Sequence, residues 1–182
     1  KEKEIIGLVG LSGAGKTTLS RLIAGLNVVS DGKVCVRAGD DWVDMSVPGP
    51  EGRGRATQYI GILHQEFTLY PFDTVLRNLT VCIGINLPAE LAKMKAIQTL
   101  IAVGFTRHQV DRMLYAYPDT LSVGEKQRIA LAQVLIREPR LIILDEPTGT
   151  MDPITKLSVA KSVLNARKEL GETFLIVSHD MD

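Results

Sequence analysis

The residues best suited to chemistry form a glycine-rich run from Gly10 to Thr17, with the sequence GLSGAGKT. It fits the pattern G-x-x-x-x-G-K-[ST] in full, with an apolar run before it and an amphipathic helical pattern after it. Glycines let the backbone curl so that amide groups point at phosphate oxygens, and a following helix N-terminus adds positive charge. A structural glycine turn is the alternative. We predict a phosphate cradle made of Gly10, Ser12, Gly13, Ala14, Gly15, Lys16, Thr17 and Thr18.

Within this cradle, two side chains have distinct expected roles. Lys16 should reach the β- and γ-phosphates of a nucleotide, and the Thr17 hydroxyl should bind Mg²⁺. An acidic pair, Asp145-Glu146, follows the apolar run 141–144. We expect Asp145 to hold the metal or its water, and Glu146 to orient or deprotonate an attacking water. By itself the pair could equally be a solvated strand edge or a helix cap. Together with the loop it predicts phosphoryl transfer from a nucleoside triphosphate.

A third motif narrows the class of nucleotide protein. A GTPase would carry an N/T-K-x-D motif, but after the loop the Thr155-Lys156 pair is followed by Leu157-Ser158. The run 121–128 has the sequence LSVGEKQR, in which Ser122 and Glu125 form a capping box that opens an amphipathic helix. Taken alone, this run indicates only a well-capped helix.

The run 121–128 also resembles the LSGGQ signature of ATP-binding cassette (ABC) ATPases, and the remaining motifs of that family follow in order. The resemblance implies ATP as the nucleotide. It assigns Gln65 to the metal and the attacking water, the loop 149–152 to a partner cassette, and His179 to the γ-phosphate. It also implies that Ser122 and Gly124 complete the phosphate site of a second cassette. Val123 and Glu125 depart from the signature, because they bring a Cβ and a carboxylate close to phosphate.

The resemblance implies a fold as well: an α/β P-loop NTPase core with a parallel sheet and an inserted helical subdomain. We expect one cassette over residues 1–182, with the helical subdomain at about 73–122. ABC cassettes usually carry upstream strands with an aromatic residue that stacks on adenine, and further strands downstream. We therefore expect this chain to be part of a longer protein.

Periodicity supports alternating strands and helices. Apolar runs predict strands at 5–9, 33–37, 59–63, 141–144 and 173–177, and helical patterns occupy 74–121 with a long helix over 88–103. Asp152 and Pro153 should begin a helix that Gly171 ends. The segment 48–55, PGPEGRGR, is predicted to be an exposed loop. This alternation predicts a parallel α/β core with a helical insertion.

Composition excludes several classes. The 182 residues contain 21 Lys plus Arg and 21 Asp plus Glu, which argues against binding to nucleic acid or anionic lipid by bulk charge. The two cysteines, Cys35 and Cys82, have no metal-ligand spacing and are expected to be small buried residues. Without a long apolar run or a signal peptide, a cytoplasmic protein is expected.

A finer resemblance concerns the runs 64–71, 74–80, 84–88 and 145–155. They are similar to the ATP-binding components of the methyl-coenzyme M reductase system of methanogenic archaea, specifically their second cassette. That similarity implies a role in ATP-dependent reductive activation, with the reductase or soluble redox proteins as partners. The rival is the ATPase subunit of a membrane transporter, with a permease as partner. A DNA-repair clamp is disfavoured because no long heptad insertion is present, and Glu146 and His179 favour hydrolysis over a non-hydrolysing clamp.

Two smaller features remain open at this point. Arg53 and Arg55 could meet an acidic partner or RNA, although a solvated loop is the preferred interpretation. Four aromatic residues around the helical region could form a docking face or pack in the core: Tyr70, Phe72, Tyr115 and Tyr117.

Overall fold

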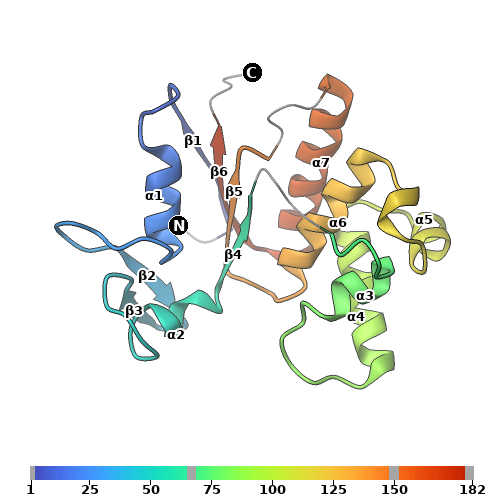
Figure 1. The fold of residues 1–182 in the computed structure, drawn as a ribbon, viewed down its shortest axis with the longest axis horizontal. Coiled ribbons are helices and arrows are strands. Elements are labelled where there is room, and N and C mark those ends of the chain that lie inside the picture. Colours follow the sequence, from blue (N-terminus) through green and yellow to red (C-terminus); the bar gives the residue numbers. More distant parts are fainter. Residues whose placement is uncertain (1–2, 65–68, 148–151, 179–182) are drawn as a thin grey trace.

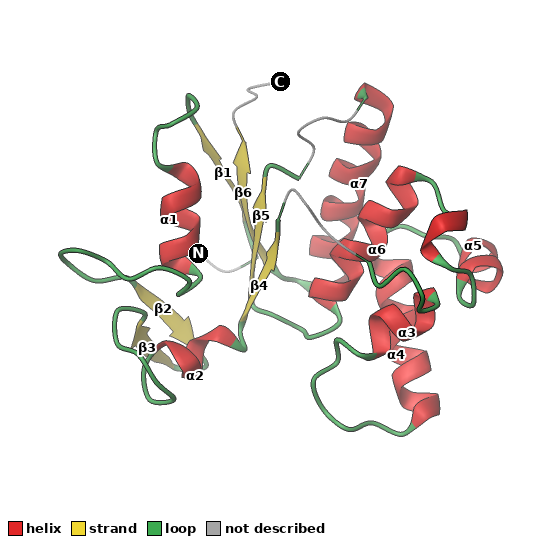
Figure 2. Cartoon of the chain, viewed as in Figure 1, coloured by secondary structure: helices red, strands yellow, loops and turns green. Residues whose placement is uncertain are grey.

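A four-stranded parallel sheet forms the centre of the computed structural model, which describes residues 3–64, 69–147 and 152–178. The strand order is β1-β6-β5-β4, and each neighbouring pair is parallel. Figure 2 shows these strands in the middle with helices on both sides. The bounds are β1 Ile5–Val9, β4 Ile60–Leu63, β5 Leu141–Asp145 and β6 Thr173–Ser178. The predicted α/β fold with a parallel sheet is confirmed.

The two faces of the sheet bury different side chains because successive residues of a strand point to opposite sides. In β5, Ile142 and Leu144 belong to a core cluster shared with the helices of the right half of Figure 1. Ile143 belongs to a second cluster, on the other face. The first four residues of β5 are apolar because both faces of the strand are covered.

The helices lie on both sides of the sheet (Figure 1). α1 (Lys16–Ile23) covers one side, and α6 (Val123–Leu135) and α7 (Pro153–Leu170) cover the other. The expected caps of α7 are confirmed: Asp152 accepts hydrogen bonds from the amides of Ile154 and Thr155, and Gly171 ends the helix in the left-handed conformation.

The helical block follows β4 in the chain. It comprises α3 (Val75–Thr80), α4 (Ala89–Ala102), α5 (Arg107–Met113) and the 3₁₀ turn η1 (Pro118–Thr120). Its apolar side chains belong to the same core cluster as those of α6, α7 and the sheet, and α3 packs against α6 while α4 packs against both α6 and α7. The helix expected over 88–103 is confirmed as α4. The limits of a helical subdomain at about 73–122 stay a prediction.

A small antiparallel unit lies on the opposite side of the molecule (Figure 1). β2 (Cys35–Ala38) pairs with β3 (Asp41–Asp44), and α2 (Arg53–Thr57) follows. The loop predicted over 48–55 is therefore wrong at its end, where α2 begins. Two of the glycines that suggested a loop serve close packing: a Cβ on Gly52 would lie 2.1 Å from the Val47 carbonyl oxygen, and a Cβ on Gly54 would lie 2.7 Å from the Gly49 carbonyl oxygen.

The surroundings of the two cysteines and of Arg53 and Arg55 bear on two further expectations. Cys35 is exposed and Cys82 is half-buried, so neither is the small core residue that was predicted. Arg53 donates to the Gly25 carbonyl oxygen over 3.3 Å, and Arg55 pairs with Asp41. These arginines therefore have partners within the fold. None of the helices in the described part of the chain is both long and apolar enough to cross a bilayer.

Candidate phosphate-binding site

The glycine-rich loop joins β1 to α1 and has the backbone conformation that a phosphate cradle needs. Gly13 and Gly15 have positive φ angles of 81° and 88°, in the left-handed region that favours glycine. A Cβ built on either residue would meet no atom within 4 Å, so the space beside the loop is open. Gly15, at the start of α1, has no side chain to cap the helix, and no side-chain cap is present there among the described residues. The N-terminal amides of α1 are thus available to an anion, as a phosphate site requires.

Lys16 lies across this loop. Its Nζ donates to the carbonyl oxygens of Gly10 over 2.7 Å and Leu11 over 2.9 Å. An ammonium has three donors, so these two bonds orient the group and leave a third for a phosphate oxygen.

Thr17 and Asp145 meet at the carboxyl end of the sheet. The Thr17 Oγ1 hydroxyl donates to Asp145 Oδ1 over 3.3 Å, which joins the start of α1 to the end of β5. A hydroxyl beside a carboxylate is the oxygen donor set that Mg²⁺ accepts when phosphates and water complete its shell. Within the described residues, no three His, Cys, Asp or Glu side chains cluster as a protein-only metal site. The residues present therefore fit a magnesium ion that a nucleotide brings with it.

Glu146 occupies a turn directly after β5. Its φ is +50°, an uncommon conformation for a residue with a side chain, and its amide donates to the Val177 carbonyl oxygen over 2.9 Å. Strained backbone of this kind clusters at functional sites. The turn brings Glu146 to the same cavity as the loop.

That cavity measures about 400 Å³. Glu146 completes a wall otherwise formed by residues of the loop and α1: Ser12, Gly13, Gly15, Lys16, Thr17 and Thr18. The structure thus brings the loop and the acidic pair together, as the sequence predicted. Gly10 and Ala14 belong to the loop but lie outside this lining.

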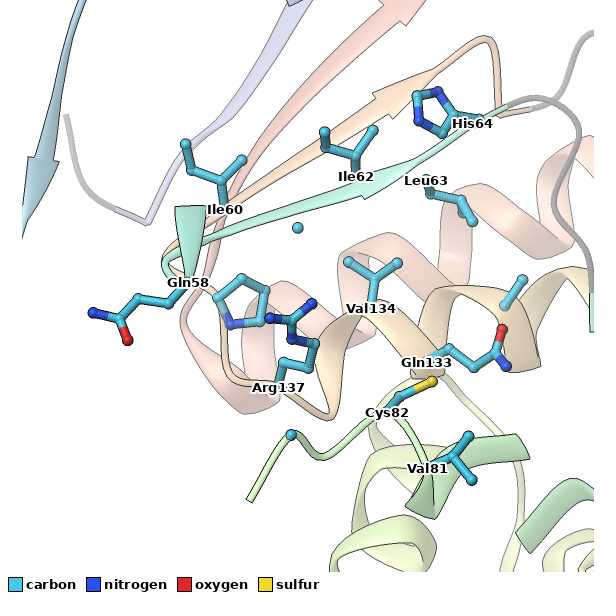
Figure 3. Close-up of a pocket in the computed structure, with 14 residues that line it drawn as sticks. Gln58, Ile60, Ile62, Leu63, His64, Val81, Cys82, Gln133, Val134 and Arg137 are labelled. Carbon is cyan, nitrogen blue, oxygen red and sulfur yellow. The ribbon is translucent and has the colours of Figure 1, made fainter. Parts of the chain in front are cut away.

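A larger groove of about 790 Å³ lies elsewhere, along the free edge of β4 (Figure 3). Ile60 and Ile62 of β4 form one side, and Val134 of α6 and Arg137, just after that helix, form another. Among the described residues, neither the glycine-rich loop nor Asp145-Glu146 lines this groove. We therefore do not assign the nucleotide to it, although it is the larger of the two.

The signature segment begins α6. The capping box predicted there is confirmed: Ser122 Oγ accepts from the Glu125 amide over 3.2 Å, and Glu125 Oε2 accepts from the Ser122 amide over 2.9 Å. Val123 is 62% exposed, and a Cβ on Gly124 would meet only Thr155 Cγ2 at 3.6 Å. Ser122 and Gly124 do not line the phosphate cavity.

The carboxylate of Glu125 is more engaged than the sequence suggested. Its Oε1 pairs with Arg112 Nη2 at 2.8 Å, and its Oε2 also accepts from the Ser122 hydroxyl over 2.9 Å. Burial would raise the pKa of Glu125, but these hydrogen bonds and the positive charges of Arg112 and Arg128 outweigh it and lower the pKa. The sequence alone does not reveal the role of Arg112, because no local pattern links α5 to α6.

Gln127 is a second residue near the site that no sequence motif predicted. It is almost fully buried on α6, and its Nε2 donates to the Pro147 carbonyl oxygen over 2.9 Å, next to Glu146. A signal was present: Gln127 lies three and four residues before the buried Ala130 and Leu131, on the same face of the helix.

Some predicted residues cannot be placed in this way. Gln65, His179 and the greater part of the loop 149–152 lie outside the described residues. Their assigned roles stay predictions.

The fold and the site define a nucleotide-binding cassette of the P-loop type. A family model described as ABC transporter matches residues 1–149 of the 182, so the chain belongs to the ABC transporter family and is a cassette of its ATPase class.

Curated relatives match nearly the whole chain. An uncharacterised ABC transporter ATP-binding protein of Methanocaldococcus jannaschii is 61% identical over 182 residues, which are all of this chain and 34% of that protein. A methionine import ATP-binding protein of Latilactobacillus sakei is 36% identical over 98% of this chain and 50% of its own length. A spermidine/putrescine import ATP-binding protein of Nitrosomonas eutropha is 35% identical over 98% of this chain and 46% of its length. The chain thus spans about a third to a half of these relatives.

Solved structures share the fold. A dimeric, post-hydrolysis structure of the ATP-binding cassette MJ0796 with ADP and Pi matches with a TM-score of 0.78 and 26% identity, over all of this chain and 77% of that one. An ABC transporter component of Clostridium perfringens, cbiO1, matches with a TM-score of 0.86 and 28% identity, over all of this chain and 69% of that one.

Proposed function

We propose that this chain is a cytoplasmic, ATP-hydrolysing cassette that acts as one half of a pair. The observation that carries the proposal is the single cavity shared by the glycine-rich loop, Lys16 and Glu146, with Thr17 hydrogen-bonded to Asp145 at its edge. The groups proposed to bind phosphate, to hold the metal and to activate water therefore lie next to one another.

Each group has a role in hydrolysis. The loop amides and the Lys16 ammonium hold the triphosphate, and Thr17 and Asp145 hold Mg²⁺ or its water. Held by Thr17 and Asp145, Mg²⁺ would supply the positive charge that offsets the negative charge of the phosphate groups. The Glu146 carboxylate orients the attacking water and accepts its proton. Gln65 and His179 are proposed to complete this arrangement.

The need for a second cassette is supported by the signature segment. Ser122 and Gly124 begin a helix but do not line the phosphate cavity, so they are free to serve another one. Gly124 has ample room for a Cβ within this chain, so its glycine is not explained by the chain's own packing. Two of the structural relatives are dimers of an ATP-binding cassette. We propose that the pair encloses ATP between one phosphate loop and the opposite signature helix.

The test is Glu146→Gln in the full-length protein. We expect ATP turnover to fall by about 1,000-fold or more, while Mg²⁺-dependent ATP binding stays within about twofold, because the amide keeps the shape but cannot accept the proton. Turnover is measured by phosphate release and binding by calorimetry. Glu169→Gln, an exposed change on α7, is the matched control. If the Glu146 variant hydrolyses ATP at the parent rate, Glu146 is not the base.

Two kinds of protein are candidates for the partner that the ATP-driven motion of this cassette pair would act on. Relatives named for methionine and for spermidine/putrescine import favour a membrane permease. The residue runs similar to reductase-activating proteins favour methyl-coenzyme M reductase or soluble redox proteins. Phe72 is 91% exposed, and Tyr70, Tyr115 and Tyr117 are also exposed, which supports a docking face over the alternative of core packing.

Purification of the tagged full-length protein from its native cell distinguishes the two partners. Recovery of a multispanning permease supports the transporter role. Recovery of reductase or iron–sulfur proteins supports the activation role. A Phe72→Ala variant should lose the specific partner and keep its basal ATP turnover, because loss of an exposed aromatic anchor weakens an interface more than a fold.

A further inference from the structure

Gln127 is a polar side chain in a place where an apolar one would ordinarily lie. It is 1% exposed, within a stretch of α6 whose other buried residues are aliphatic. Its Nε2 donates to the Pro147 carbonyl oxygen over 2.9 Å. Its Oε1 is buried and has no hydrogen-bond partner in the part of the chain that the structure describes. A half-satisfied buried amide is a poor source of stability, so stability alone does not explain it.

The hydrogen bond of Gln127 is directed at the turn that carries Glu146. Pro147 is the next residue, and Glu146 has the strained φ of +50°. The turn is held from two sides: the Glu146 amide donates to Val177 of β6 over 2.9 Å, and the Pro147 carbonyl accepts from Gln127 of α6. Because Pro147 has no amide hydrogen, its carbonyl is its only backbone group through which a neighbour can fix it.

The same helix begins at the signature segment. Ser122 caps α6, and Gln127 lies about one and a half turns further along. Helix α6 is stiffened at its start by the capping box and by Arg128, whose guanidinium lies 3.9 Å over the Phe105 ring and donates to the Gly124 carbonyl over 3.4 Å. A displacement at Ser122 would therefore move Gln127 with it.

We propose that Gln127 is a positioning residue: it holds the turn that carries Glu146 and transmits movement of the signature helix to the hydrolytic carboxylate of the same cassette. This proposal rests on the function proposed above. Under this proposal, Glu146 reaches its hydrolytic position only when a nucleotide held by the partner cassette contacts the start of α6. The two nucleotide sites of a pair are thereby coupled through one buried amide.

The test compares two glutamines of α6 in the full-length protein. Gln127→Met keeps the length of the side chain and removes both the donor and the unpartnered acceptor. Gln133→Met is the matched control, because Gln133 also donates its Nε2 to a backbone carbonyl, that of Asn78 over 3.1 Å, but not to the acidic turn. For Gln127→Met we expect kcat to fall about tenfold, with ATP affinity within about twofold of the parent. For Gln133→Met, kcat stays at the parent value.

A second readout does not depend on turnover. Hydrogen exchange of the Glu146 amide in nucleotide-free protein should be about tenfold faster in Gln127→Met, because the turn loses its α6 contact, and unchanged in Gln133→Met. Parent exchange together with parent kcat in Gln127→Met overturns the proposal, and so do equal losses of kcat in both variants. If the parent and Glu146→Gln turn over ATP equally, the proposed function fails, and the exchange result still decides the role of Gln127.

Discussion

At the residue scale, the two departures from the ABC signature have different surroundings. The carboxylate of Glu125 is paired with Arg112 and accepts two hydrogen bonds from Ser122, so its charge is largely compensated within the chain. The isopropyl group of Val123 has no such accommodation, because it is 62% exposed at the first position of α6. Steric bulk at Val123 is therefore the more consequential departure for a pair of cassettes.

This difference leads to a prediction for Val123→Gly. Removal of the side chain should allow closer approach of the partner's nucleotide, so half-maximal ATP-driven closure should need about 3- to 10-fold less ATP. Closure is followed by an ATP titration of distance-labelled, full-length protein in the Glu146→Gln background, where turnover does not intervene. Val28→Gly, at a loop residue of similar exposure, is the control. Unchanged or weaker closure in Val123→Gly contradicts the prediction.

Residue types and short spacings sufficed for the parts of the site that lie in one continuous segment. The loop from Gly10 to Thr17 and the pair Asp145-Glu146 were predicted from motifs; Glu146 shares a cavity with the loop, and Asp145 accepts a hydrogen bond from Thr17. Arg112 and Gln127 were not given roles, because their partners come from another helix or turn and leave no local pattern. Side-chain pairing between elements is a tertiary property.

At the element scale, one glycine determines how closely α6 approaches the sheet edge. A Cβ on Gly61 of β4 would lie 2.3 Å from Val134 Cγ1 of α6 and 3.1 Å from Pro139 Cγ. Gly7 of β1 is different, because its Cβ would meet only Val9 Cγ2 at 3.8 Å. Close packing therefore requires glycine at position 61 but not at position 7.

We therefore expect Gly61→Ala to lower the free energy of unfolding by about 1–3 kcal/mol through overpacking, and Gly7→Ala to change it by less than about 1 kcal/mol. Urea denaturation followed by circular dichroism measures both. Adding Val134→Ala to Gly61→Ala should restore part of the loss, since it removes the group that clashes. A Gly61→Ala protein as stable as the Gly7→Ala protein would show that β4 and α6 separate at little cost.

Elements with strong local signals were predicted well, and elements defined by contacts were not. The ends of α7 follow from Asp152, Pro153 and Gly171, whose cap chemistry is local. The short helix α2 was missed because glycines around it indicate a loop, whereas Gly52 is needed where the chain passes the Val47 carbonyl. Propensity is a weak guide where tertiary contacts decide.

At the scale of the whole molecule, the proposed phosphate site lies at the carboxyl end of the sheet, and a separate charged group lies where β6 begins. Glu172 precedes β6 in a small cavity that it shares with Arg140 and two further basic residues, Lys3 and Arg37. Burial raises the pKa of Glu172 to about 7, with a further rise from Glu138 that Arg140 partly offsets. The global stability of the fold should therefore depend on pH through this group.

The pKa of Glu172 is higher in the folded protein than in the unfolded chain, and this sets the direction of the pH dependence. Between the unfolded pKa of about 4.3 and the folded pKa of about 7, stability falls as pH rises, because the ionised carboxylate is poorly solvated in the fold. Glu172→Gln cannot ionise, so it should be about 2 kcal/mol more stable than the parent at about pH 8 and equal to it at about pH 4. Urea unfolding at both values, with Glu169→Gln as the exposed control, measures the difference. An equal effect of Glu172→Gln at both pH values would mean that its ionisation is not the cause, because a packing change does not titrate.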